Sequence, residues 1–160
     1  MFYEIYNKKK FSDKNIYDNF VQDSVSVSKK NVLRGLHYKV KKSQSQLLTI
    51  LEGEIFDCVV DLRKSSKTYL SVFSFILNSK KNNQIYMPKG MAHGFCVLSN
   101  KAILHYNASQ NYDPKNQNGI RWNDIDLDIK WPIKRPIISN RDNKFRSLAE
   151  LIKLKLLPKL

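Results

Sequence analysis

The chain has 160 residues, 42% hydrophobic and 26% charged, which predicts one soluble globular domain over residues 1–160. Its formal net charge is +14, but the lysines are scattered and no arginine–glycine or aromatic–basic pattern accompanies them. We therefore expect no nucleic-acid partner, and interpret the positive potential as a means of steering an anionic ligand.

Membrane insertion and secretion are not expected either. No apolar run reaches the roughly 18 residues that a bilayer span needs, and the first ten residues lack the apolar core of a signal peptide. Two cysteines, Cys58 and Cys96, lie inside alternating apolar runs. This setting favours buried thiols over a disulfide, and the cytoplasm is the expected compartment.

In chain order, the first expected element is a short helical turn within Phe11 to Asp18. The middle of the chain is typical of strands: Gln46 to Leu62 predicts two strands with a turn at Glu52-Gly53. Further β-rich runs follow at Tyr69 to Leu77, Gln84 to Met87, Gly94 to Leu98 and Ala102 to Asn107. Short strands separated by turn residues predict an antiparallel sandwich or barrel.

A C-terminal helix is expected after Ser147. Ser147 and Glu150 form a capping-box pattern, and an apolar stripe continues to Leu157 before Pro158. Docking of this basic, apolar tail onto its own sandwich or a partner subunit is favoured, and contact with a membrane surface is the alternative.

Three histidines are candidate functional residues. His37 follows Gly35, where a backbone can approach a neighbour closely, and His93 lies in a turn that leads into an apolar strand. His105 precedes Tyr106 in a predicted strand, so the two side chains must face opposite ways. The spacing Pro-x-Gly-x-x-His around His93 resembles the second motif of the cupins. No His-x-His pair accompanies it, so we expect no metal.

Five linked segments make a more specific resemblance, to the dTDP-4-dehydrorhamnose 3,5-epimerases. In order these are Asn31 to Tyr38 (NVLRGLHY), Gly53 to Asp57 (GEIFD), Asp61 to Ser66 (DLRKSS), Pro88 to Phe95 (PKGMAHGF) and Gly119 to Asp124 (GIRWND). The match runs from about Phe2 to Asp142, with the motifs in family order and spacing.

The resemblance implies an all-β, cupin-like jelly roll with short peripheral helices and a C-terminal helix. It implies epimerisation at C3 and/or C5 of a nucleotide-linked 4-keto-6-deoxy sugar, of the dTDP-4-dehydro-6-deoxyglucose type, in deoxysugar and surface polysaccharide biosynthesis. His37 would be the base, Asp142 its hydrogen-bond partner and Tyr106 the proton donor. We expect no cofactor, and we expect the protein to form a homodimer.

The same resemblance assigns ten residues to substrate binding. Arg34 and His93 match positions that contact the diphosphate and the sugar, and Tyr112 matches a tyrosine that stacks on thymine. The full set is Glu4, Gln22, Asp23, Ser24, Arg34, Gln46, His93, Tyr112, Gln117 and Arg141. Asp57 is either a carboxylate near the base or an ordinary inward-facing polar residue.

Two departures from the family bear on activity. Gln46 stands where the family has a lysine thought to stabilise the enolate oxygen. This departure implies a lower activity, an altered substrate, or a substitute lysine among Lys39, Lys41 and Lys42. The family also carries a longer N-terminal segment with a phosphate-binding arginine and a strand exchanged between subunits. A nucleotide-sugar 3,4-ketoisomerase and a catalytically weak sugar-nucleotide binding protein are the alternative functions.

Overall fold

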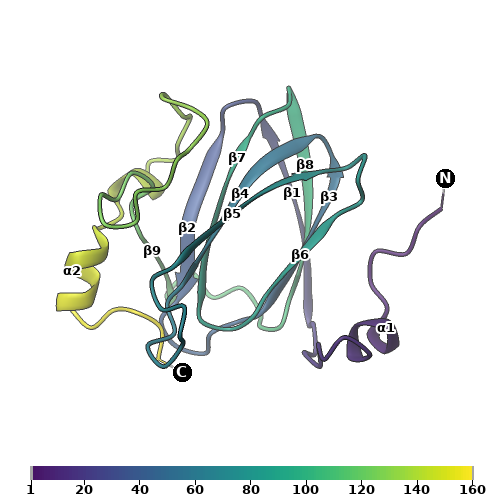
Figure 1. Ribbon diagram of the computed structural model, residues 1–160, viewed down its shortest axis with the longest axis horizontal. Helices are drawn as coiled ribbons and strands as arrows, with labels where there is room; N and C mark the ends of the chain where they lie inside the picture. The colour runs from purple at the N-terminus through teal and green to yellow at the C-terminus, as the bar shows by residue number, and fades with distance from the viewer. Residues whose placement is uncertain (1, 160) are drawn as a thin grey trace.

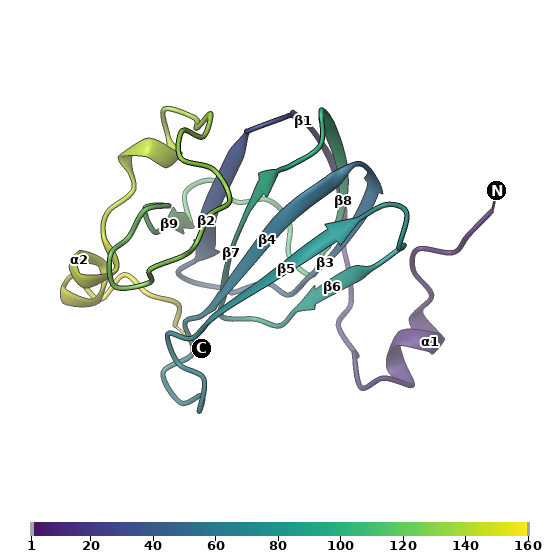
Figure 2. The same cartoon turned by 45° about the horizontal axis from the view of Figure 1, so that its top comes forward.

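Two antiparallel sheets face each other in the computed structural model, which describes residues 2–159 (Figures 1 and 2). The four-stranded sheet has the order β1 (Gln22–Lys29), β8 (Lys101–Ala108), β3 (Gln46–Glu52) and β6 (Gln84–Met87). The five-stranded sheet has the order β5 (Val72–Asn78), β4 (Glu54–Asp61), β7 (Met91–Val97), β2 (Leu33–Lys39) and β9 (Gln117–Gly119). The all-β jelly roll expected from the sequence is confirmed.

The space between the sheets is filled by aliphatic side chains that alternate along each strand. On β4, Ile55 and Val59 point toward the other sheet, while Cys58 and Val60 point outward, and all four are buried. Leu48 and Leu104 meet them from the four-stranded sheet. Because β4 is buried on both faces, the five-stranded sheet must be covered on its outer face as well.

That cover is the C-terminal part of the chain, which includes helix α2 (Leu148–Lys153) (Figure 1). The predicted capping box is confirmed, since Ser147 and Glu150 cap each other. The helix ends at Lys153 rather than continuing to Leu157, because Lys155 takes a left-handed backbone with φ 54°. The turn allows Leu157 to pack with Leu151 in the outer core, so the tail docks onto its own sandwich.

The N-terminal segment lies on the opposite side of the molecule from α2 (Figure 1). Its helix α1 covers Lys8–Ser12, earlier than expected, because the Asn7 side chain caps it and Asn15 turns left-handed at φ 62°. Gln84 on β6 donates to the carbonyl oxygen of Ile5 over 2.7 Å, which ties this segment to the four-stranded sheet.

Two further predictions concern the cysteines and the membrane. Cys58 and Cys96 are both buried, and both are free thiols, as expected. Within residues 2–159, helices fall short of the length and apolar character that a bilayer crossing requires.

Candidate active site

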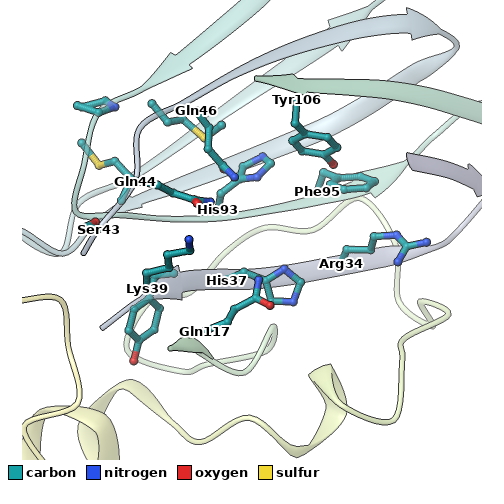
Figure 3. Close-up of a pocket in the computed structure, with 14 residues that line it drawn as sticks. Arg34, His37, Lys39, Ser43, Gln44, Gln46, His93, Phe95, Tyr106 and Gln117 are labelled. Carbon is teal, nitrogen blue, oxygen red and sulfur yellow. The ribbon is translucent and has the colours of Figure 1, made fainter. Parts of the chain in front are cut away.

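A pocket opens between the two sheets, and its opposite walls come from different sheets (Figure 3). The five-stranded sheet supplies Arg34, His37 and Lys39 from β2, Met91, His93 and Phe95 from β7, and Gln117 from β9. The four-stranded sheet supplies Gln46, Met87 and Tyr106. Of the lining residues in the described part of the chain, not one is an aspartate or glutamate.

An irregularity in β2 brings Arg34 and His37 to the same wall. Arg34 pairs with Phe95 on β7 and His37 pairs with His93, so three steps along β2 match two steps along β7. One extra residue reverses the alternation of side chains, and two residues that a regular strand would place on opposite faces both reach the pocket.

Gly35 makes this irregularity possible. Its φ is +121°, and a Cβ built on it would lie 2.5 Å from the Cα of Gly94. Only glycine combines that backbone with so close an approach. The close approach expected after Arg34 is therefore an approach of β2 to β7.

His37 is held by Asp142, which lies in the short 3₁₀ helix η1 (Asp142–Lys144). His37 Nε2 and Asp142 Oδ1 are 3.0 Å apart, and the second carboxylate oxygen accepts from the Gly35 N–H over 3.1 Å. Although burial raises the pKa of Asp142, the hydrogen bond and charge of His37 and the Gly35 N–H lower it to about 2. Asp142 is therefore a buried carboxylate, and as the acceptor for Nε2–H it leaves the lone pair on His37 Nδ1.

Arg141 adds positive charge beside this pair. Its guanidinium lies 3.0 Å from His37 Nε2, donates to Gln117 Oε1 over 3.0 Å and contacts Asp142 over 3.2 Å. Since arginine has no acceptor, Nε2 cannot both donate to Asp142 and accept from Arg141, and the carboxylate is the stronger partner.

Tyr106 faces His37 from the other wall (Figure 3). The predicted parity is confirmed, because Tyr106 lines the pocket while His105 points outward and lies 3.6 Å from Asp23. Burial raises the pKa of Tyr106, so its hydroxyl stays protonated at neutral pH. A carboxylate-bound histidine and a protonated tyrosine hydroxyl thus stand on opposite sides of one pocket.

A second histidine–carboxylate pair lies deeper in the same wall. Asp57, on β4, is 2.7 Å from His93 Nε2, and both side chains are buried. Asp57 was expected to be either a carboxylate near the base or an ordinary inward-facing polar residue. The structure shows that it binds His93 and not His37. The alternation of residues along β4 indicates that Asp57 faces inward, but it does not indicate that His93 is its partner.

The expected binding residues fall into two groups. Arg34, Gln46, His93 and Gln117 line the pocket, and Arg141 borders it. A second group gathers at the start of β1: the Gln22 amide donates to Ser24 and accepts from the Tyr112 backbone, while Asp23 contacts Asn107. Tyr112 itself is exposed.

Glu4 stands apart from both groups. It forms an ion pair with Lys10 over 2.8 Å and accepts from Asn7 over 2.9 Å. In the single chain, therefore, the structure does not bring Glu4 to the pocket.

Of the three lysines that could substitute for the family lysine replaced by Gln46, Lys39 reaches the pocket. Its side chain is buried, whereas Lys41 and Lys42 are exposed. Sequence reasoning assigned no role in the site to the remaining lining residues, which are Tyr38, Ser43, Gln44, Met87, Pro88, Met91 and Phe95. Searched over residues 2–159, histidine, cysteine and acidic side chains form no group of three placed to bind a metal ion.

The fold and the site together define a cupin-like jelly roll in which a histidine–carboxylate pair and a tyrosine face each other across one pocket. A family model described as dTDP-4-dehydrorhamnose 3,5-epimerase matches residues 1–150. The chain belongs to this family and is an isomerase.

Three similar proteins indicate the range of the family. The dTDP-4-dehydrorhamnose 3,5-epimerase of Methanothermobacter thermautotrophicus is 39% identical over 152 residues, covering 93% of this chain and 82% of the relative. A dTDP-4-dehydrorhamnose 3-epimerase of Streptomyces niveus is 38% identical over 138 residues, covering 86% of this chain and 67% of the relative. The crystal structure of a Legionella pneumophila 3,5-epimerase in complex with dTDP-4-keto-L-rhamnose has a TM-score of 0.92 at 39% identity, covering 99% of this chain and 85% of that one.

Proposed function

We propose that this chain epimerises a nucleotide-linked 4-keto-6-deoxy sugar, of the dTDP-4-dehydro-6-deoxyglucose type, at C3, C5 or both. The observation that carries the proposal is the placement of His37 and Tyr106 on opposite walls of one pocket, with Asp142 behind the histidine. Inversion of a carbon requires a proton to leave one face and another to arrive on the opposite face.

The reaction follows from the acidity of a carbon next to a ketone. His37 removes the proton, the electron pair of the C–H bond forms a carbon–carbon double bond, and the ketone oxygen becomes an enolate. The Tyr106 hydroxyl then gives a proton to the other face of the carbon. A positioned acid or base typically contributes about 10²–10⁴-fold to the rate. Asp142 fixes the tautomer of His37 and stabilises the imidazolium that forms.

The residues at the mouth of the pocket suit a nucleoside diphosphate. Arg34 is exposed there, and it and Arg141 present planar donors that match phosphate oxygens. Tyr112 offers an exposed ring for a base, next to Gln22. The net charge of +14 favours the approach of such an anion.

Deuterium exchange tests the proposed function. The purified protein is mixed with dTDP-4-keto-6-deoxyglucose in deuterium oxide, and the product is analysed by proton NMR. Label at C3 and C5 indicates a double epimerase, and label at C3 alone a 3-epimerase. Ketone migration from C4 to C3 would identify a ketoisomerase, and binding without label would identify a binding protein; either result contradicts the proposal.

A homodimer in the cytoplasm completes the proposal. Val25 and Val27 are exposed on the outer face of the edge strand β1, which is the kind of apolar surface that a second copy covers. Free buried thiols fit a reducing compartment. Light scattering should give twice the mass of the chain for the wild type, and the monomer mass for Val25→Glu/Val27→Glu. A monomeric wild type would contradict the dimer.

A further inference from the structure

Lys39 occupies a position in the pocket that the acid–base pair leaves unexplained. It lies on β2 two residues after His37, so both side chains project from the same face of the strand, about 7 Å apart along it. Both line the pocket with Gln46 and Tyr106. Figure 3 shows the Lys39 side chain rising from β2 into the space beside His37.

The Lys39 ammonium is buried, and no carboxylate among residues 2–159 lies within ion-pair distance of it. Lys39 is 6% exposed, and within residues 2–159 its one hydrogen-bond acceptor is the carbonyl oxygen of Asn111, 2.7 Å from Nζ. The residue paired with Lys39 on the neighbouring strand β9 is the neutral Gln117. Burial lowers the pKa of Lys39, while the charge of Asp113 acts in the opposite direction. A buried cation costs free energy unless it is paired, and a ligand that brings negative charge would pair it.

We propose that the Lys39 ammonium binds the ketone oxygen of the substrate and carries the negative charge that develops on it when His37 removes the proton. This inference rests on the proposed function. The ketone oxygen is two bonds from the carbon that loses its proton, so a cation beside the base meets it. Lys39 stays protonated throughout, and the electron pair returns from the oxygen to carbon when Tyr106 delivers its proton.

The alternative ligand for the Lys39 ammonium is the diphosphate of the substrate, and the arrangement of residues along β2 argues against it. Arg34 and Lys39 stand at opposite ends of the row of pocket residues on this strand, with His37 between them (Figure 3). Arg34 is exposed and Lys39 is buried. A diphosphate keeps its negative charges close to solvent, so the exposed Arg34 suits it better, and the buried Lys39 suits an oxygen whose charge develops only during the reaction.

The test separates catalysis from binding. In Lys39→Met, the rate constant for deuterium incorporation at saturating substrate should fall by about 10²–10³-fold, the usual loss for one donor to an oxyanion. The dissociation constant for dTDP, which has the diphosphate but no ketone, should change less than about threefold. Lys41→Gln, an exposed lysine outside the pocket, is the matched control and should exchange at the wild-type rate.

A second pair of variants tests charge against shape. Lys39→Met/Gln46→Lys moves the cation to the facing wall of the same pocket and should recover at least tenfold of the lost rate, whereas Lys39→Met/Gln46→Met should recover nothing. Equal recovery in both double variants, an unchanged rate in Lys39→Met, or a dTDP affinity lowered as far as the rate would each overturn the role of Lys39. Absence of exchange in the wild type would overturn the proposed function as well.

Discussion

His37 and Asp142 are 105 residues apart in the sequence and are joined by a 3.0 Å contact between Nε2 and Oδ1. The same carboxylate accepts the N–H of Gly35, within the irregular part of β2. One buried acidic group therefore orients the imidazole and also holds the stretch of backbone that aims it at the pocket. A defect at Asp142 should alter both the chemistry and the local structure.

Asp142→Asn should lower the rate of deuterium incorporation by about 10²-fold or more. The asparagine amide can donate to Nε2, which would place the His37 proton on Nδ1 and remove the lone pair that acts as base. The rate at substrate saturation measures this loss. Asp126→Asn, at an exposed position in the same C-terminal part of the chain, should retain wild-type activity. A variant Asp142→Asn as active as the wild type would show that the carboxylate does not set the tautomer.

Tyr106→Phe should separate proton removal from inversion. The variant keeps His37 and Asp142, so the substrate should still exchange its proton with deuterium oxide. Without the hydroxyl on the opposite wall, deuterium returns from the His37 side and the configuration is retained. The yield of epimer should fall by about 10²–10⁴-fold. NMR of the labelled sugar distinguishes retention from inversion, and full inversion in this variant would remove Tyr106 from its assigned role.

Gly35→Ala should destabilise the fold and reduce activity together. The new methyl group would meet Gly94 at 2.5 Å on a backbone with φ +121°, and strain of this kind costs about 1–3 kcal/mol before β2 moves. Urea denaturation measures the loss. Gly90→Ala, at a second glycine with positive φ (89°), is the control for adding a Cβ to such backbone. A loss no larger than the control's would mean that the approach to Gly94 is easily relieved.

Much of the sheet structure could be predicted from local patterns. The bounds of β6 are those expected, and the parity of His105 and Tyr106 follows from strand geometry alone. Strands β1 and β2 were missed. β1 is an edge strand in which Val25 and Val27 are exposed and the serine after each is more buried, so it has no apolar inward face. β2 contains a glycine and an extra residue, which hide its alternation.

The site was less accessible to sequence reasoning than the strands were. No local pattern connects His37 with Asp142, and the assignment came from the family resemblance. Asp57 illustrates the limit, since its inward parity was visible but its partner, His93, depends on the register between β4 and β7. The choice of Lys39 over Lys41 and Lys42 likewise required knowing where β2 ends.

The low pKa of Asp142 predicts how stability depends on pH. Its pKa is about 2 in the folded chain against an ordinary value of 3.8, so between these values the unfolded chain binds the proton more readily. The contribution is therefore fully present above about pH 3.8 and is lost as the pH falls through about 2. A shift of this size corresponds to a stabilisation on the order of 2 kcal/mol.

Urea denaturation of the wild type and Asp142→Asn at pH 6, 4, 3 and 2.5 measures this contribution. The free energy of unfolding should differ most between the two proteins at pH 6, and the difference should shrink at pH 3 and below, because the Asp142 carboxylate of the unfolded wild-type chain takes up a proton there before that of the folded chain does. Asp126→Asn should show no such trend, since that side chain is exposed. A difference that stays constant from pH 6 to pH 2.5 would mean that Asp142 supports the fold through shape and hydrogen bonding and not through its charge.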